Sequence, residues 1–456
     1  MITRITRVKI WPLVIYAAII WVAGVSRVSL GVPLFLFSLY AYYRARRLYL
    51  KNFRLVNLAL LFLLNFTGAF FLVRNHGPII ALPFSAIPML AALLFNSLEV
   101  SLLLTLAGAV SIFSLANFSL GVIFLVSGIS SSILIFGARK RSTVIRAGLA
   151  VGVIQALTLM LLEGFWPTAM LKYLYLILNG LASSVVVLGI LAVFEYFFQT
   201  NTNISLLELA DFQHPLLQRM VLEAPGTYHH SLVVGNISES ACDAVGANAL
   251  LARVGAYYHD IGKLSKPEYF SENQLLKSNK HDTLSPAMSK LIIMNHVREG
   301  LELARKYRLK PAIVDFIRQH HGNSLVYYFY RRALEGLEDD HEVKEEGFRY
   351  PGPKPRTKEA AIVLLADSVE AATRALKDPE PAKIEELVHK VVNNKFIDGQ
   401  LDECDLTLND LEKISATFVR ILSGIYHSRV NYPEEISSGN SHKKLSGQDP
   451  HQPEKA

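Results

Sequence analysis

Seven histidine and aspartate side chains in the second half of the chain could together bind metal ions. The steps between successive groups are 29, 37, 24 and 46 residues, so no short zinc motif such as HExxH or CxxC fits them. Ligands this far apart would come from separate helices, as in dimetal sites built of carboxylates and histidines. The residues are His230, His259, Asp260, His296, His320, His321 and Asp367.

Each of these residues also has a simpler structural interpretation. A single histidine on a helix is usually a hydrogen-bonded surface or core residue. Asp367 lies in the apolar stretch IVLLADSVEAA and needs a partner, because burying an unpaired carboxylate costs several kcal/mol. Arg374, two helical turns later, could be that partner. Neighbours on a helix point about 100° apart, so only one residue of each pair, His229-His230 and His320-His321, is expected to face a site, unless a helix end lets both turn inward.

The segments that carry these residues read as helices. Helical periodicity is visible in 222–247, 247–260, 284–307, 310–322, 357–376 and 407–426. Thr227 is a candidate N-cap, Ser285 followed by Pro286 is a second, and Gly262 is a candidate stop signal. No alternating strand pattern of useful length occurs. The sequence therefore predicts an all-α fold.

The first part of the chain has the composition of a membrane domain. Mean hydropathy is +0.29, and the apolar runs are concentrated between Ile10 and Phe198. A bilayer core of about 30 Å needs roughly 20 helical residues, and most of eight apolar segments are long enough. The first two are short and could be two spans or a re-entrant pair. The segments are 10–25, 29–43, 55–73, 78–95, 98–116, 118–137, 144–164 and 171–197.

These patterns divide the chain into four parts. We expect a polytopic transmembrane bundle of seven or eight helices over 1–198, followed by a connector over 199–221. A soluble all-helical domain is expected over 222–432, and the polar residues 433–456 read as a disordered tail.

Charge predicts the orientation and limits the partners. Residues 1–54 hold nine Lys/Arg and no acid, and YRARRLYLKNFR and ARKRSTVIR are the richest basic loops. The positive-inside rule then places both loops and the soluble part in the cytoplasm. Beyond residue 198 the chain has 31 basic and 36 acidic residues, which argues against a nucleic-acid polymer as partner. Two cysteines without a CxxC spacing give no disulfide framework.

The motif residues carry a resemblance to a known family. The order H…HD…H…HH…D resembles the signature of the HD-superfamily metal phosphohydrolases. The stretches EAPGTYHHSLVVGNISESA, ANALLARVGAYYHDIGKLSKPEYFSENQ and YPGPKPRTKEAAIVLLADSVEAA resemble the seven-transmembrane HD family, the PgpH-type cyclic di-AMP phosphodiesterases. The resemblance covers roughly residues 29–430. It implies that the soluble part is a cytosolic HD phosphohydrolase domain.

The resemblance implies a site with two divalent transition metal ions. By the family pattern, His230, His259, Asp260 and Asp367 hold one ion. Asp260 bridges to a second ion, which is held by His296, His320 and His321. Ligation rich in histidine suits Mn or Fe better than Mg or Ca.

The resemblance also gives expectations for catalysis and substrate contacts. Asp260 and Lys263 are the expected catalytic residues, and the Lys263 ammonium could neutralise a phosphate oxygen. Arg349, Lys354 and Arg356 flank the YPGPKP loop and are candidate substrate contacts. Two ions about 3.5–4 Å apart can stabilise both the attacking and the leaving oxygen at phosphorus.

The implied function is hydrolysis of cyclic di-AMP to pApA in second-messenger signalling, by a multi-pass protein of the plasma or inner membrane. One alternative is a signalling receptor whose HD module binds nucleotide without turnover. Another is an HD nucleotide phosphohydrolase with a different substrate. HDTLSP at 281–286 stands where cyclic di-GMP hydrolases have a glycine-tyrosine-proline motif, which favours adenine. The partners expected are the cyclic dinucleotide and the lipid bilayer, and a homodimer is left open.

The resemblance departs from the family in one place. Family members usually carry a large extracytoplasmic domain between a first helix and the seven spans. Here that interval is only VSRVS, so we expect little protein outside the membrane to bind a ligand.

Overall fold

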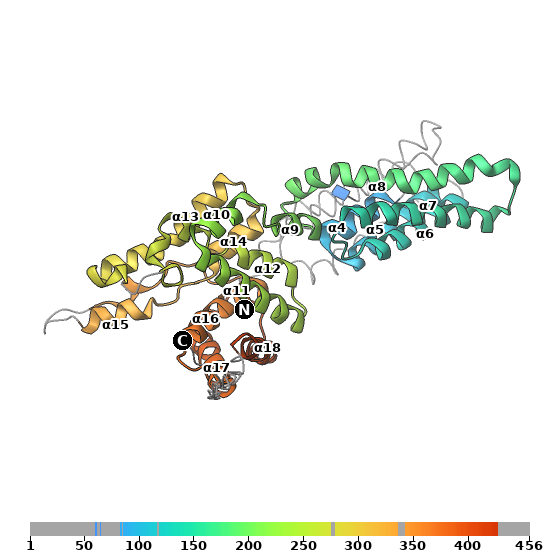
Figure 1. The fold of residues 1–456 in the computed structure, drawn as a ribbon. Coiled ribbons are helices and arrows are strands. Elements are labelled where there is room, and N and C mark those ends of the chain that lie inside the picture. The colour runs from blue at the N-terminus through green and yellow to red at the C-terminus, as the bar shows by residue number, and fades with distance from the viewer. Residues whose placement is uncertain are drawn as a thin grey trace, which may run out of the picture.

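A computed structural model describes residues 85–115, 118–274, 279–335 and 343–426, together with positions 60, 61, 64 and 83. Within these ranges the regular elements are all helices, and one isolated bridge joins Leu325 to Arg349. This confirms the predicted all-helical fold. An apolar group of helices lies at one end of the molecule and a second, larger group at the other (Figure 1).

The apolar group contains the candidate membrane spans. Among the described residues, three helical segments are long and apolar enough to cross a membrane: Phe118–Ile135, Arg141–Glu163 and Pro167–Phe198. The predicted segments 10–25 and 29–43, and most of 55–73, lie outside the described residues. The helices are α4 (Ala86–Phe95), α5 (Leu98–Leu115), α6 (Phe118–Ile135), α7 (Arg141–Glu163) and α8 (Met170–Phe198), with the short η2 (Pro167–Ala169) before α8.

Small residues let α7 and α8 pack closely. A Cβ atom added to Gly180 would lie 2.4 Å from the carbonyl oxygen of Gly148 and 2.4 Å from the amide nitrogen of Gly152. A side chain at this position would therefore force the two backbones apart. Small residues at helix interfaces are typical of membrane bundles, in which close van der Waals contact replaces the hydrophobic effect.

The second group consists of ten helices and five short 3₁₀ turns among the described residues. Proline at the first position starts five of the helices, where its missing N–H costs no hydrogen bond. The helices are α9 (Asn203–Leu209), α10 (Pro215–Glu223), α11 (Pro225–Ala244), α12 (Ala249–Tyr258), α13 (Pro286–Lys306), α14 (Pro311–Gln319), α15 (Tyr327–Glu335), α16 (Lys358–Arg374), α17 (Pro381–Ile397) and α18 (Leu408–Tyr426). The turns are η3 (Ile261–Ser265), η4 (Pro267–Tyr269), η5 (Ser271–Asn273), η6 (Lys280–Thr283) and η7 (Glu345–Phe348).

Helix α16 forms the centre of this group. It packs against α11, α12, α14, α17 and α18, and an unbroken run from Ala360 to Asp367 is buried. A helix that is apolar on every side is a core helix, so the polar residues it carries are buried with it. Asp367 and Glu370 are therefore buried with the helix that carries them.

The structure confirms one predicted helix cap and corrects another. Ser285 caps α13 by accepting a hydrogen bond from the Met288 amide. Thr227 is not the cap of α11, because that helix begins two residues earlier at Pro225. The Thr227 hydroxyl instead bonds to Glu272, and its amide bonds to Asn273.

The connection between the two groups is held by polar contacts. The Glu195 carboxylate near the end of α8 accepts hydrogen bonds from Thr202 and from the Lys310 ammonium, which lies 2.7 Å away. Arg141 at the start of α7 pairs with Glu208 on α9 at 2.6 Å. The predicted connector 199–221 consists mainly of α9 and α10. Helix α8 is thus joined directly to the corner from which α14 begins.

Candidate metal centre

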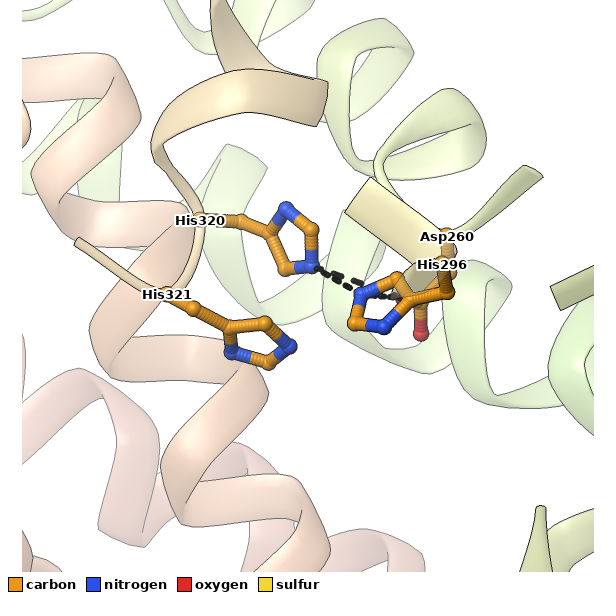
Figure 2. A group of neighbouring side chains, drawn as sticks. All are labelled: Asp260, His296, His320 and His321. Carbon is orange, nitrogen blue, oxygen red and sulfur yellow. Dashed lines mark hydrogen bonds and ion pairs between the residues drawn. The ribbon is translucent and has the colours of Figure 1, made fainter. Parts of the chain in front are cut away.

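Two groups of ligand atoms lie in the centre of the helical domain, and Asp260 belongs to both. Within each group the atoms lie within 4.8 Å of one another. The first group is His230 on α11, His259 at the end of α12, Asp260, and Asp367 on α16. The second group is Asp260, His296 on α13, and His320 and His321 at the end of α14 (Figure 2). All seven predicted ligands are brought together.

The two oxygens of Asp260 face different groups. Oδ1 lies 3.4 Å from His296 Nε2 and 3.5 Å from His320 Nε2. Oδ2 lies 3.2 Å from His259 Nε2 and 3.7 Å from His230 Nε2. One carboxylate can therefore contribute an oxygen to an ion on each side, which is the arrangement a bridging ligand needs.

Hydrogen bonds to Nδ1, the ring nitrogen that points away from the cluster, hold the imidazole rings in place. In four of the histidines Nδ1 meets an acceptor, which leaves Nε2 to point into the cluster. Metal-binding histidines commonly use their second nitrogen in this way, because the bond sets the tautomer and the ring orientation. The Nδ1 partners are Glu370 Oε2 for His230 at 2.6 Å, and the carbonyl oxygens of Ala256 for His259 at 2.6 Å, Ile293 for His296 at 2.5 Å and Ile317 for His320 at 3.0 Å.

The cluster contains buried polar atoms that fit a cation. His259 Nε2 and Asp260 Oδ1 are buried and have no hydrogen-bond partner among the described residues. Leaving such atoms unsatisfied costs free energy, and a bound divalent cation would satisfy both. The donor set of imidazole nitrogens and carboxylate oxygens therefore fits a divalent metal.

The charge states of four side chains suit metal binding. Burial acts to raise the pKa of Asp260, but His259 and Lys263 hold it well below its usual value. The pKa of Asp367 is likewise lowered, by His230 and His259, against the effect of burial. Burial lowers the pKa of His296 to about 4 and that of His321 well below its usual value. The aspartates are thus ionised and these two imidazoles neutral, which are the forms that bind metals.

Two histidines of the first group have the opposite shift. Burial acts to lower the pKa of His230, but hydrogen bonds to Asp367 and Glu370 raise it. Against the same effect of burial, Asp260 and Asp367 raise the pKa of His259 to about 10. The negative charge around these rings thus favours a cation, which can be a proton or a metal ion.

The two pairs of adjacent histidines are arranged differently. His230 is buried, whereas His229 is exposed to solvent. His320 and His321 both face the cluster, and both follow the last residue of α14, Gln319. The His321 ring stacks on Tyr350 with the ring centres 4.3 Å apart, and its Nδ1 lies 3.6 Å from Asp367 Oδ2.

Asp367 is paired with histidines and not with Arg374. Its Oδ1 lies 3.0 Å from His230 Nε2. Arg374 instead approaches Glu370, at 3.8 Å. Sequence analysis missed Glu370, which is buried and holds the outer nitrogen of His230. Its spacing of three from Asp367 was an available signal, because residues three apart lie on one helix face.

Lys263 lies close to the adjacent residues His259 and Asp260, and its ammonium is already paired with carboxylates. Its ammonium lies 2.7 Å from Asp260 Oδ2 and 2.7 Å from Glu272 Oε1, above the Phe270 ring. The lysine therefore neutralises the shared carboxylate. Glu272 is a second residue that sequence analysis missed, and it ties Lys263 to Thr227 at the start of α11.

The other predicted substrate contacts are paired with carboxylates of residues 398–403. Arg349 binds Asp398 at 2.8 Å, Lys354 binds Asp402 at 3.1 Å and Arg356 binds Glu403 at 3.0 Å. None of the three belongs to the metal-ligand groups. Their role in substrate binding stays a prediction.

Gly262, two residues after Asp260, permits a close contact between η3 and α13. A Cβ atom at Gly262 would lie 1.8 Å from the His296 carbonyl oxygen and 2.5 Å from the Gly300 amide nitrogen. No larger residue fits there without moving α13. Gly262 thus fixes the distance between Asp260 and the helix that carries His296. It lies within η3 and not at the end of α12, so the expected stop signal is not its role.

Comparison with known families agrees with this fold and site. The family described as HD domain matches residues 227–372, which include every residue of the two ligand groups. The family described as 7TM receptor with intracellular HD hydrolase matches residues 18–202. The two matches define a membrane protein with an HD domain. The chain is thus similar to this seven-transmembrane HD family in its first part and to the HD family in its second.

Its relatives include proteins named cyclic-di-AMP phosphodiesterase PgpH. The Bacillus subtilis protein is 39% identical over 430 residues, which cover 90% of this chain and 60% of the relative. The Listeria monocytogenes protein is 38% identical over 391 residues, covering 84% and 54%. The chain thus spans little more than half the length of these relatives. A crystal structure of the L. monocytogenes PgpH HD domain in complex with cyclic-di-AMP also matches, with 47% sequence identity and a TM-score of 0.46. The match covers 47% of this chain and 100% of that domain.

Proposed function

We propose that this chain is a membrane-anchored, metal-dependent phosphodiesterase that hydrolyses cyclic di-AMP to pApA and so acts in second-messenger signalling. The observation that carries the proposal is the position of Asp260, with one oxygen toward each group of histidines. The names of the PgpH relatives support cyclic di-AMP as the substrate.

The proposed ligands divide as the family pattern implies. His230, His259, Asp260 and Asp367 would hold one ion, and Asp260, His296, His320 and His321 the other. When bound, two divalent transition ions such as Mn or Fe would supply Lewis-acid catalysis at phosphorus.

The remaining residues orient and neutralise this set. Glu370 and three backbone carbonyls hold the imidazoles so that Nε2 faces the cluster. Lys263 balances the charge of Asp260, and Glu272 holds Lys263 in place. The His321 side chain is 24% exposed, while the side chains of His230, His259, Asp260, His296 and His320 are at most 2% exposed. The substrate is therefore proposed to enter from the His321 side.

Tyr350 places the YPGPKP loop close to this entrance. Its ring lies against His321, and Arg349 directly precedes it. We propose Lys263, Arg349 and Lys354 as substrate contacts on this basis. Arg349 and Lys354 would exchange their present carboxylate partners for phosphate oxygens, which also accept charge-assisted hydrogen bonds.

The proposed location is the plasma or inner membrane with the HD domain in the cytoplasm. The basic loop that contains Arg139, Lys140 and Arg141 lies at the end of the apolar group that meets the HD domain, as the contact between Arg141 and Glu208 requires. Basic loops remain on the cytoplasmic side, so this arrangement supports a cytoplasmic HD domain. We retain the division into 1–198, 199–221, 222–432 and 433–456. The last part and its boundary lie outside the described residues, which end at 426.

The proposal is tested by turnover and metal content measured on one sample. The full chain is purified in detergent and given cyclic di-AMP, cyclic di-GMP and deoxynucleoside triphosphates, and the products are separated. We expect two Mn or Fe ions per chain, pApA as product, and loss of turnover after chelation that Mn or Fe restores.

The alternatives give different results in the same experiment. Tight binding of cyclic di-AMP by metal-loaded protein without any product would indicate a receptor. Faster release of triphosphate from deoxynucleotides than turnover of either cyclic dinucleotide would indicate a nucleotide phosphohydrolase. Either result contradicts the proposed activity.

A further inference from the structure

A cavity lies where the last membrane helix meets the metal-bearing domain. It has a volume of about 720 Å³ and lies between the end of α8 and the corner that joins α13 to α14. Its wall has an apolar and a basic part, formed by Ala192, Tyr196, Leu309, Arg305, Arg308 and Lys310. None of these residues belongs to the metal centre.

The basic part of the wall has more positive than negative charge. Glu195 is the acid that lines the cavity, and the Lys310 ammonium neutralises it at 2.7 Å. Arg305 and Arg308 are exposed, and no carboxylate of the described residues forms an ion pair with either. The two guanidinium groups are therefore available to an anion, and guanidinium binds phosphate with paired hydrogen bonds.

Arg308 occupies a position at which glycine is usual. Its φ is 54°, in the left-handed region. The Leu309 amide bonds back to the Ala304 carbonyl oxygen at 2.8 Å, which is the hydrogen bond of a Schellman motif at the end of α13. A residue with a Cβ atom is strained there and glycine is not. The backbone gains nothing from the arginine, so the side chain accounts for its presence.

The aromatic residues beside the cavity place it at a membrane surface. Tyr196 and Phe197 lie in the last turn of the apolar helix α8 and are 72% and 64% exposed. Aromatic side chains at the end of a span are typical of the interface between lipid and water. The arginines on the other wall come from the HD domain. They therefore approach the membrane interface, where Tyr196 and Phe197 lie, from the aqueous side.

We propose that this cavity binds a phosphate group, with Arg305 and Arg308 as its ligands and the headgroup of an anionic membrane lipid as its source. The apolar wall formed by Ala192 and Leu309 suits the part of a lipid that lies between the headgroup and the acyl chains. The site is distinct from the metal centre, and Lys310 connects the two, because it precedes α14 and that helix ends at Gln319, next to His320.

The test measures lipid binding by the full chain in uncharged detergent. Phosphatidylglycerol and phosphatidylcholine are titrated, and retained lipid is counted by native mass spectrometry. Glycerol phosphate and inorganic phosphate form a second arm. We expect phosphatidylglycerol to bind most tightly, and Arg308→Gly and Arg305→Gln each to weaken it about tenfold, as for one charge-assisted hydrogen bond.

The matched control is Lys306→Gln, which removes one positive charge next to Arg305 but outside the cavity wall. A surface attraction without a site would be weakened equally by all three changes, and that result overturns the proposal. So does unchanged binding by Arg305→Gln and Arg308→Gly. Arg308→Gly relieves backbone strain, so its melting temperature should not fall, and lost binding would not reflect misfolding. Equal affinity for glycerol phosphate and lipid would support the phosphate site and assign it to a soluble ligand.

Discussion

The apolar helices and the helices that carry the candidate metal ligands bury polar groups of different kinds. In the apolar group the buried polar side chains are mostly small and neutral, as where the Ser101 and Ser132 hydroxyls meet at 2.6 Å. In the HD domain they include a group of ionisable side chains, and histidines and carboxylates from five segments meet at Asp260. Polar burial in the first region holds neighbouring helices together, whereas in the second it prepares a site. Substitutions should therefore affect stability in one region and activity in the other.

Removal of the shared carboxylate should have the largest effect on activity. Asp260→Ala removes a ligand from both groups, so the several kcal/mol supplied by metal-ion catalysis would be lost, or about 10³-fold in turnover. Helix content measured by circular dichroism should remain. Asp243→Ala, at an exposed position on α11, is the control and should keep its activity. Turnover by Asp260→Ala close to that of the unmodified chain would contradict the dimetal assignment.

The adjacent histidines on α11 provide the next test. His230→Ala should lower turnover more than roughly 100-fold, because even an outer partner of a metal ligand is worth about 10–100-fold. His229→Ala removes an exposed imidazole from the same turn and should change turnover less than about twofold. Steady-state kinetics of the two variants measures both losses and shows which histidine is the ligand. Equal losses would show that burial does not identify the ligand.

Glu370→Gln should have an intermediate effect. It keeps the shape of the side chain but removes the charge that holds His230 Nδ1, so metal affinity should fall about 10–100-fold. Titration of the metal-free chain with Mn measures this, and excess metal should restore most of the turnover. Glu385→Gln, at an exposed position on α17, is the matched control. A loss that excess metal cannot restore would argue for a direct catalytic role.

Overpacking of the apolar group should have the smallest effect on activity. Gly180→Leu forces α7 and α8 apart, and overpacking costs about 1–3 kcal/mol of stability. Gly189 lies on the same helix with no atom within 4 Å of an added Cβ, so Gly189→Leu should melt like the unmodified chain. Below its melting temperature Gly180→Leu should keep turnover within about twofold. A large loss of turnover would show that packing between these helices controls the HD domain.

Much of the site could be read from the sequence, because residue type and order carry it. The adjacent His259 and Asp260 and the isolated histidines gave the candidate ligands that the structure brings together. Sequence alone could not decide between His320 and His321, because the answer depends on α14 ending at Gln319. The end of a helix depends on tertiary contacts as well as on local preference.

The errors come from partners that are distant in the sequence. Thr227 looked like a helix cap, but its partners Glu272 and Asn273 lie 45 and 46 residues later. Arg349 and Lys354 are candidate substrate contacts, and the sequence did not reveal that they pair with Asp398 and Asp402, which come from beyond α17. Local patterns predict helices well, whereas the pairing of exposed charges is decided only when the helices have packed.

The candidate metal ligands come from five separate segments of the chain, and metal binding would therefore affect how the domain unfolds. Ions bound at Asp260 would join α11, α12, α13, α14 and α16 as a cross-link that the unfolded chain cannot keep. A ligand that binds only the native state at 100 times its dissociation constant adds about 2.7 kcal/mol to the free energy of unfolding. The melting temperature of the HD domain should therefore rise with metal concentration, and the supply of metal would determine how long the protein survives as well as how fast it works.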